Sequence, residues 1–306
     1  ENHPDLPQRS FICDVRDRDR VFNLFETVKP ALVFHAAALK HVPVVELQPC
    51  EGILTNAIGT RNVADAANAF AAEAMVLIST DKAVHPSSVM GASKRLAETY
   101  CQALDLEAAA KSGHGPATRF VTVRFGNVLG STGSVVPLFT RQLKNGGPLT
   151  VTNQDMTRYF MTVREAVELV LQASALAAGN GEVPKGNICV LDMGEPVRIY
   201  DLAEQMIRLA GYVPGKDVKI EIVGIRPGEK LYEEVFHGGE PLVPTDCAGI
   251  LLAAPRAADT NALTEAIAQL KAHCSAFDTD GALMTIQELV PEFLGTQDDA
   301  NSVASA

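Results

Sequence analysis

The sequence predicts an α/β protein with a doubly wound parallel sheet and a smaller C-terminal α/β lobe. Short apolar runs such as residues 75–78 stop abruptly at a polar residue, as buried strands of parallel sheets do. Helical patterns separate these runs, so that strand, helix and strand alternate at the spacing of a parallel sheet. A chain of 306 residues with 47% hydrophobic content can bury the core that such a sheet needs.

The N-terminal half contains most of this alternation of strands and helices. Residues 17–28 favour a short helix with Val21, Leu24 and Phe25 on one face. Residues 48–70 favour a long helix, and another is expected to begin near Met90 and to run to about residue 111. The apolar runs between the helices predict strands at residues 10–13, 31–35, 75–78 and 119–125.

The alternation of strands and helices becomes less regular after Gly126. A capping-box pattern at Thr162 predicts the start of a helix, whose expected apolar face consists of Val163, Val167, Val170 and Leu171. A further short helix should end at Gly211. The remaining expectations are strands at residues 187–191 and 219–223, two amphipathic helices within 261–294, and a frayed tail at 297–306.

Composition narrows the classes of partner. The formal net charge of −11 argues against a nucleic-acid surface, because phosphate backbones are bound through clustered Lys and Arg. No apolar run approaches the ~20 residues of a membrane helix, so we do not expect this chain to insert into a membrane. The six cysteines show neither a C-x-x-C pair nor a His/Cys metal spacing, which predicts reduced thiols, a cytoplasmic location and no metal site.

The stretch at residues 75–94, MVLISTDKAVHPSSVMGASK, concentrates polar groups. Thr80, Asp81 and Lys82 follow its apolar run and would lie at the carboxyl end of a strand, where open α/β sheets bind ligands. Met90 and Lys94 are four residues apart and would share one face of the next helix. These polar groups are therefore expected to converge on one pocket. The alternative for Asp81 and Lys82 is an exposed ion pair on a loop.

This stretch resembles the nucleoside-diphosphate-sugar 4,6-dehydratases of polysaccharide biosynthesis, within the extended short-chain dehydrogenase/reductase superfamily. Most of that superfamily has Tyr-x-x-x-Lys where this sequence has Met90 and Lys94. A subgroup of bacterial UDP-N-acetylglucosamine 4,6-dehydratases is similar in carrying the methionine. The resemblance extends through HAAALKHVP at residues 35–43, TNAIGTRN at 55–62, RFGNVLGS at 124–131 and RPGEKLYEE at 226–234.

The resemblance implies a Rossmann-like sheet and a division into two lobes. Residues 1–128 and 158–192 would form a dinucleotide-binding lobe, and residues 129–157 and 193–306 a nucleotide-sugar-binding lobe. The family's first strand and glycine-rich turn should precede the phrase at Asp14, yet the sequence contains no G-x-G-x-x-G. We therefore expect a chain truncated at its N-terminus, whose full-length form could be tethered to the inner membrane by upstream helices.

The implied cofactor is a tightly bound NAD or NADP, with NAD favoured, regenerated in every cycle. In the family the adenine lies near the phrase that begins at Asp14, the loop after His35 runs along the cofactor, and Lys94 binds the ribose hydroxyls. Without the resemblance, Asn56 would be interpreted as a solvent-facing or capping residue. The implied cofactor-binding residues are Asp14, Val15, His35, Ala36, Ala37, Ala38, Lys40, Asn56 and Lys94.

The implied substrate is a UDP-sugar, and the expected assembly is a homo-oligomer. The planar guanidinium of Arg226 suits a pyrophosphate, with Arg158 as its partner across the cleft. Either arginine could instead be a solvated surface residue. The segment around Val136 resembles the one that contacts the nucleotide base. The implied substrate-binding residues are Asn127, Val136, Arg158, Arg226 and Glu229.

A 4,6-dehydration needs an acid and a base, and the resemblance implies Asp81 as the acid. Lys82 replaces the glutamate base of related sugar dehydratases and is implied as the base. A lysine base must lose its proton, so we expect burial and the Lys94 cation to lower the Lys82 pKa. Met90 cannot accept a proton, which leaves Thr80, Asp81 or a water relayed toward Lys94 to take the C4 hydroxyl proton. The implied catalytic residues are Thr80, Asp81, Lys82, Met90 and Lys94.

These motifs favour a nucleotide-sugar 4,6-dehydratase, an NAD(P)-dependent lyase that converts UDP-N-acetylglucosamine to a UDP-4-keto-6-deoxy sugar for surface polysaccharide or glycan biosynthesis. The Asp81 and Lys82 pair favours this reaction, because simple 4-epimerisation needs no such pair. The alternatives are an epimerase or reductase on the same scaffold and a non-catalytic fragment that binds a sugar nucleotide.

Overall fold

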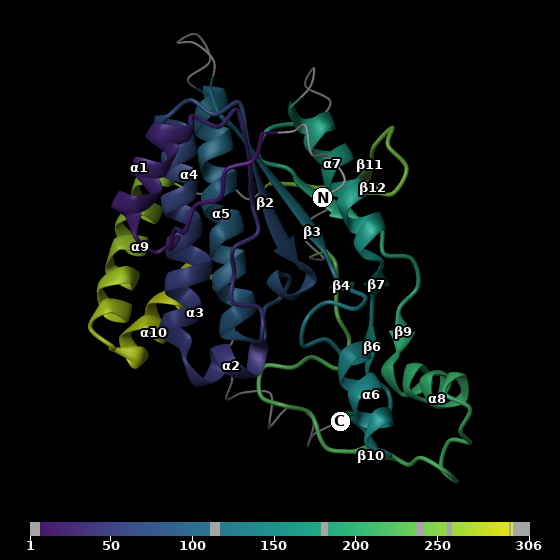
Figure 1. Cartoon of the computed structure of the whole chain (residues 1–306). Coiled ribbons are helices and arrows are strands. Elements are labelled where there is room, and N and C mark those ends of the chain that lie inside the picture. The colour runs from purple at the N-terminus through teal and green to yellow at the C-terminus, as the bar shows by residue number, and fades with distance from the viewer. Residues whose placement is uncertain are drawn as a thin grey trace.

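The structure is a computed structural model that describes residues 7–110, 117–178, 183–236, 242–255, 259–293 and 295. Its centre is a six-stranded sheet in the order β1-β2-β3-β8-β12-β11 (Figure 1). The first four strands run parallel, and the last two are antiparallel to their neighbours. In this order the strands are β1 (Leu32–His35), β2 (Ala74–Thr80), β3 (Arg119–Phe125), β8 (Ile188–Leu191), β12 (Ile250–Ala253) and β11 (Leu242–Pro244).

Helices cover both faces of this sheet (Figure 1). One face carries α1 (Arg18–Val28), α4 (Gly59–Ala69) and α5 (Val89–Ala110), and the other carries α7 (Val163–Ala178). Successive side chains of β2 accordingly enter different cores, because Met75 and Leu77 pack with the first set of helices and Val76 packs with α7. The prediction of a Rossmann-like, doubly wound α/β sheet is confirmed.

The long helix predicted at residues 48–70 is one helical run with an irregular middle. It consists of α3 (Pro49–Ile53), a π-helical turn η1 (Leu54–Ile58) and α4, and the short helix α2 (Val42–Leu47) precedes it. Asn56 lies in the π turn. Its amide accepts a hydrogen bond from the backbone N–H of Leu39 at 2.7 Å and donates one to the Leu39 carbonyl at 3.0 Å. The turn thereby fixes the loop that follows β1.

The C-terminal part of the chain returns to the main sheet. The two predicted helices are present as α9 (Thr260–Ser275) and α10 (Thr279–Leu289), and they pack in the same core as α3 and α5. Strands β11 and β12, which the sequence did not predict, extend the sheet. The expected division assigned all of residues 193–306 to the smaller lobe; the division into domains remains a prediction. The expected tail at 297–306 lies outside the described residues.

A smaller group of elements lies beyond the carboxyl ends of the parallel strands (Figure 1). Its core is formed by α6 (Val135–Lys144), α8 (Ile199–Leu209) and the parallel pair β5 (Leu149–Val151) and β10 (Ile220–Ile222). Gly211, with a φ of 85°, follows α8 as predicted. The remaining short strand pairs are β4 (Asn127–Val128) with β7 (Phe160–Met161) and β6 (Thr157–Arg158) with β9 (Val197–Arg198).

The strand predicted at residues 10–13 is wrong. A strand requires a neighbour for its backbone groups, and within the described residues this segment pairs with none. Phe11 and Ile12 are exposed by 49% and 104%. Apolar residues alone therefore misidentified an extended surface segment.

The predicted apolar face of α7 is also wrong, although its capping box is confirmed. The Thr162 N–H donates to Glu165 Oε2 at 2.7 Å, and the Glu165 N–H donates to Thr162 Oγ1 at 3.2 Å. Of the expected face only Val170 is buried, and Val163, Val167 and Leu171 are each more than half exposed. The buried face is instead made by Ala166, Val170, Ala173 and Ala177, whose small side chains let the helix approach the sheet closely.

Among the described residues, no helix combines the length and the apolar character that a bilayer crossing requires.

Candidate active site

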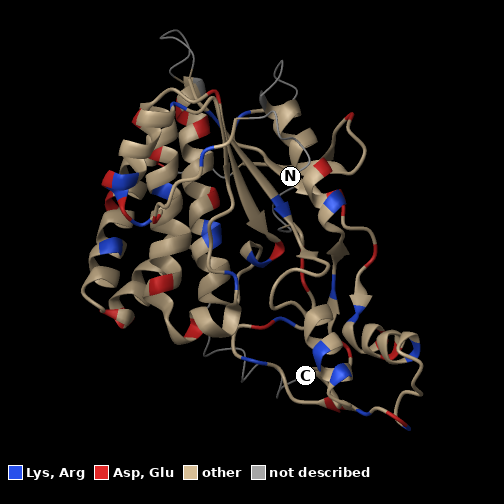
Figure 2. Cartoon of the chain, in the orientation of Figure 1, with Lys and Arg blue, Asp and Glu red and all other residues tan. Residues whose placement is uncertain are grey.

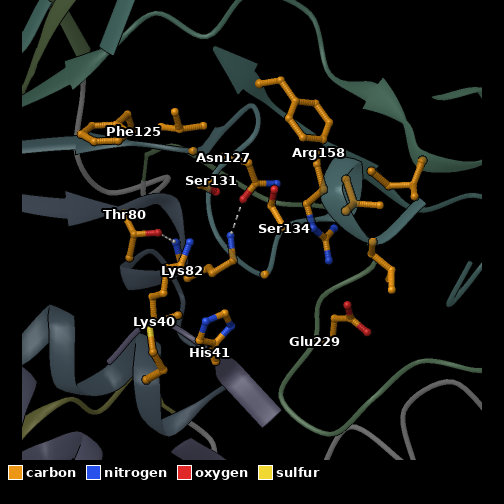
Figure 3. A pocket seen from close by; sticks show the side chains of 18 of the residues that line it. Lys40, His41, Thr80, Lys82, Phe125, Asn127, Ser131, Ser134, Arg158 and Glu229 are labelled. Atoms are coloured by element: carbon orange, nitrogen blue, oxygen red, sulfur yellow. Dashed lines mark hydrogen bonds between the residues drawn. The ribbon is translucent and has the colours of Figure 1, made fainter. Parts of the chain in front are cut away.

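A pocket of about 470 Å³ lies at the carboxyl ends of β1, β2 and β3, facing the smaller lobe. In Figure 3, Lys82 points toward Asn127, and Arg158 and Glu229 lie across the pocket from Thr80. The fold thus brings together side chains from distant parts of the sequence. The predicted site residues that line the pocket are Ala36, Ala38, Lys40, Thr80, Lys82, Met90, Lys94, Asn127, Arg158, Arg226 and Glu229.

Asp81 and Lys82 form an ion pair at the end of β2. They belong to the short 3-10 turn η2 (Asp81–Ala83). Figure 2 shows basic and acidic segments close together at the carboxyl ends of the central strands. Lys82 Nζ donates to Asp81 Oδ1 at 3.0 Å and to Asn127 Oδ1 at 3.2 Å. Thr80 Oγ1 donates to the same Asp81 oxygen at 2.8 Å. The alternative of an exposed ion pair is excluded for this conformation, because Asp81 is 0% exposed and the Lys82 side chain 23%.

The close approach of Gly126 keeps Asp81 enclosed. A Cβ atom at position 126 would lie 3.1 Å from Asp81 Oδ2, at the point where β3 ends. Within the described residues this buried oxygen has no hydrogen-bond partner. Asp81 therefore lies behind Lys82, with one oxygen bonded to the lysine and the other buried against Gly126.

The prediction that the Lys82 pKa is lowered is wrong. Burial does lower this pKa, but the carboxylates of Asp81 and Glu233 outweigh it and raise the pKa above its ordinary value. Glu233 Oε1 lies 3.4 Å from Lys82 Nζ. Sequence reasoning missed Glu233 although it belongs to the RPGEKLYEE phrase, because no local pattern tells which of the two adjacent glutamates faces a lysine so far away in the chain.

Lys94 and Met90 reach the pocket from the first turns of α5. Lys94 Nζ donates to the Ile78 carbonyl at 2.7 Å, and burial lowers the Lys94 pKa to about 8, against an opposing effect of Glu98. Met90 is 3% exposed and contributes an apolar wall. A buried network holds the helix in place, since Glu98 accepts hydrogen bonds from Ser79 Oγ and from the Arg124 guanidinium.

The loop after β1 forms another part of the pocket wall. Ala36, Ala38 and Lys40 line the pocket, whereas Ala37 does not. His35 lies below the loop, with Nε2 2.9 Å from Thr60 Oγ1, and burial together with the Lys94 cation lowers the His35 pKa to about 3. A neutral, hydrogen-bonded imidazole of this kind positions the strand end.

The other residues predicted for cofactor binding lie outside the pocket lining. Asn56 supports the same loop from beneath through Leu39 and donates to Ser93 Oγ at 3.0 Å. Asp14 is exposed and pairs with Arg16, whose guanidinium lowers the Asp14 pKa. The Val15 carbonyl accepts a hydrogen bond from Asn62 Nδ2 at 2.9 Å.

The residues predicted for substrate binding differ in their availability. Arg226 is exposed, and within the described residues its guanidinium has no hydrogen bond or ion pair. Arg158 is 7% exposed, and its guanidinium is held mainly by backbone carbonyls. The acceptors are the carbonyls of Thr157 at 2.7 Å, Lys230 at 2.7 Å and Leu231 at 3.3 Å.

Val136 does not line the pocket; its neighbours Val135 and Leu138 on α6 do. In the part of the chain that the structure describes, no three His, Cys, Asp or Glu side chains gather as metal ligands.

Comparison with known proteins places the chain in a family. EpsC of Bacillus subtilis, named a probable polysaccharide biosynthesis protein, is 53% identical over 229 residues, which are 75% of this chain but only 36% of the relative. A UDP-glucose 4-epimerase of Rickettsia akari is 36% identical over 239 residues, covering 78% of this chain and 65% of the relative. The chain thus spans about a third of the length of EpsC.

Among solved structures, Pen from Bacillus thuringiensis has a TM-score of 0.70 and 35% sequence identity, over 82% of this chain and 74% of that chain. Residues 2–255 match the family described as "Polysaccharide biosynthesis protein". The family membership predicted from the motifs is therefore confirmed, and the chain belongs to the polysaccharide biosynthesis protein family.

Proposed function

We propose that the protein is a nucleotide-sugar 4,6-dehydratase, a lyase that converts UDP-N-acetylglucosamine to a UDP-4-keto-6-deoxy sugar for surface polysaccharide or glycan biosynthesis. The observation that carries this proposal is the Lys82 ammonium facing the pocket with the buried Asp81 carboxylate 3.0 Å behind it. Removing the C5 proton and releasing the C6 hydroxyl as water requires a base and an acid close together. A simple 4-epimerase requires no such pair.

The pair can supply both groups without a change of total charge. Transfer of one proton along the Lys82 Nζ to Asp81 Oδ1 hydrogen bond converts ammonium and carboxylate into a neutral amine and a neutral acid. In our proposal the amine takes the C5 proton, and the acid protonates the departing C6 oxygen. The raised pKa of Lys82 favours the charged form, so our proposal requires the neutral form to be populated in the complex with the sugar.

We propose a nicotinamide dinucleotide as the cofactor, with NAD favoured over NADP, and the small side chains of Ala36 and Ala38 on the pocket wall support the binding of such a group. When bound, this group would take a hydride from the sugar and return it, so that the cofactor is regenerated. Lys94 would hold its ribose hydroxyls, and Lys40 would contribute to its binding. Met90 would pack beside it, while Thr80, bonded to Asp81, would be one route for the C4 hydroxyl proton.

The nucleotide sugar would be held from the smaller lobe. Arg226 has an exposed guanidinium fork suited to a pyrophosphate, without a partner among the described residues, and Glu229 and Asn127 line the same pocket. Arg158 contributes charge and shape, since most of its donors are occupied. We further propose that the protein is a homo-oligomer and that it is located in the cytoplasm. Nucleotide sugars are available there, and the six free cysteines stay reduced.

The second candidate is a UDP-sugar 4-epimerase, which the relative in Rickettsia akari favours by its name. Mass spectrometry of the product formed from UDP-N-acetylglucosamine separates the two. The purified protein supplied with NAD should give a product that has lost one water, without net formation of NADH. A product with the mass of the substrate would overturn the dehydratase in favour of the epimerase.

A further inference from the structure

Glu233 reaches the Lys82 ammonium of the Asp81 and Lys82 pair from the segment 226–234. Its carboxylate lies between two cations, with Oε1 3.4 Å from Lys82 Nζ and 3.7 Å from Arg158 Nε. The side chain is 2% exposed, and its second oxygen, Oε2, has no hydrogen-bond partner within the described residues. Burying a carboxylate is costly unless cations lie close to it, and here these are the lysine and the arginine.

Hydrogen bonds join the segment around Glu233 to the loop after η2, and they hold the Glu233 carboxylate in place. Lys230 Nζ donates to the Val84 carbonyl at 2.7 Å, and Ser87 Oγ donates to the Gly228 carbonyl at 3.2 Å. These contacts tie the segment 226–234 to the strand end that carries Lys82.

The charges of this cluster balance. Asp81 and Glu233 are the anions, Lys82 and Arg158 the cations, and each carboxylate is within 3.4 Å of the lysine nitrogen. Loss of the Glu233 charge would leave a nearly buried arginine and lysine facing one carboxylate. The charged or titratable groups that face Lys82 or line the small pocket beside it are Lys40, His41, Asp81, Arg158, Arg226, Glu229, Lys230 and Glu233.

We propose that Glu233 is a positioning residue that holds the Lys82 ammonium beside Asp81 and links this pair, through Arg158, to the segment that carries Arg226. Glu233 lines a small pocket beside Lys82 that shares Lys82, Arg158 and Arg226 with the main pocket, and in this proposal it acts through the lysine. The inference rests on the proposed role of Lys82 as an acid/base group. It predicts that the Glu233 charge sets the pH range in which Lys82 changes its protonation state.

The test is an NMR titration of Lys82 in protein with ¹⁵N-labelled lysine side chains and no substrate. The Lys82 signal is identified by its absence from Lys82→Met. In Glu233→Gln, which keeps the shape and removes the charge, the midpoint of the Lys82 titration should move to lower pH by about one to three units, the range for one close charge. Glu233→Asp should move it less, because the charge remains at a greater distance.

The matched control is Glu234→Gln, which removes the neighbouring, exposed carboxylate that pairs with His85 and should leave the Lys82 midpoint unchanged. An unchanged midpoint in both Glu233→Gln and Glu233→Asp would overturn the inference. If Glu233→Gln does not fold, Glu233→Asp decides alone. A Lys82 midpoint at lower pH than in the parent protein then supports the inference, and an unchanged midpoint overturns it. Because the titration needs no turnover, it can succeed or fail independently of the dehydratase assignment, which product analysis tests.

Discussion

Gly91 lies directly against the backbone carbonyl of Lys82, so that a Cβ atom at position 91 would overlap the carbonyl oxygen. The contact joins the first turn of α5 to η2, and it thereby sets where the Lys82 side chain begins.

Replacing Gly91 by alanine should displace one of these two turns. We expect Gly91→Ala to lower turnover at least about tenfold, because a shift of roughly 1 Å breaks the alignment of Lys82 with Asp81. The free energy of unfolding should fall by only about 1–3 kcal/mol, as is typical of overpacking. Turnover measured beside thermal unfolding checks both values. A folded variant with parental turnover would show that the contact does not position the lysine.

Met90 is predicted to fill space. Met90→Leu preserves the apolar volume and should keep turnover within about tenfold, because a volume-conserving exchange typically costs less than ~1.5 kcal/mol. Steady-state kinetics with UDP-N-acetylglucosamine measure the effect. A collapse of turnover without loss of folding would mean that the thioether takes a direct part in the reaction.

Arg226 should contribute mainly to the affinity for the nucleotide sugar. Arg226→Ala is expected to raise the Kd about 10- to 100-fold, the value of a charge-assisted hydrogen bond, and Arg226→Lys should recover little of it, since an ammonium lacks the bidentate fork. Calorimetric titration with the nucleotide sugar gives the Kd. Arg208→Ala, which removes an exposed arginine paired with Glu204 on α8, is the control and should bind normally. Parental affinity in both Arg226 variants would make Arg226 a surface residue.

The affinity for the cofactor should depend on pH through Lys94. Its pKa of about 8 lies below the ordinary lysine value, so the ammonium is present below pH 8 and is lost as the pH rises through that value. Binding of NAD, followed by fluorescence, should therefore weaken between about pH 7 and pH 9. Lys94→Met should bind NAD weakly across the whole range. If its affinity falls between pH 7 and pH 9 as in the parent protein, another group is responsible.

Local patterns predicted the four parallel strands of the main sheet and much of the pocket. The stretch from Met75 to Lys94 contains a strand, a turn and a helix in sequence, so its own geometry brings Thr80, Lys82 and Met90 to one edge. The same reasoning failed where the outcome depends on a distant partner. Residues 10–13 have the composition of a strand but no neighbour to pair with, and α7 turns its alanines toward the sheet because the packing distance favours small residues.

The error on Lys82 has the same origin. Burial and a neighbouring lysine are visible in the sequence and favour a lowered pKa, whereas the carboxylate of Glu233 becomes a neighbour only in the folded chain. Two close carboxylates outweigh the effect of burial. The charge state of a site residue could thus not be predicted without the fold, although the residue itself could.

The central claim is that Lys82 removes the C5 proton of the sugar. During turnover in deuterated water, NMR of the product should show deuterium at C5 with the parent protein and with Glu234→Gln. Lys82→Met should abolish both the loss of water and the appearance of deuterium at C5, while a trace of reduced cofactor from the first hydride transfer should still form. Deuterium appearing at C5 at the parental rate in Lys82→Met would contradict the account.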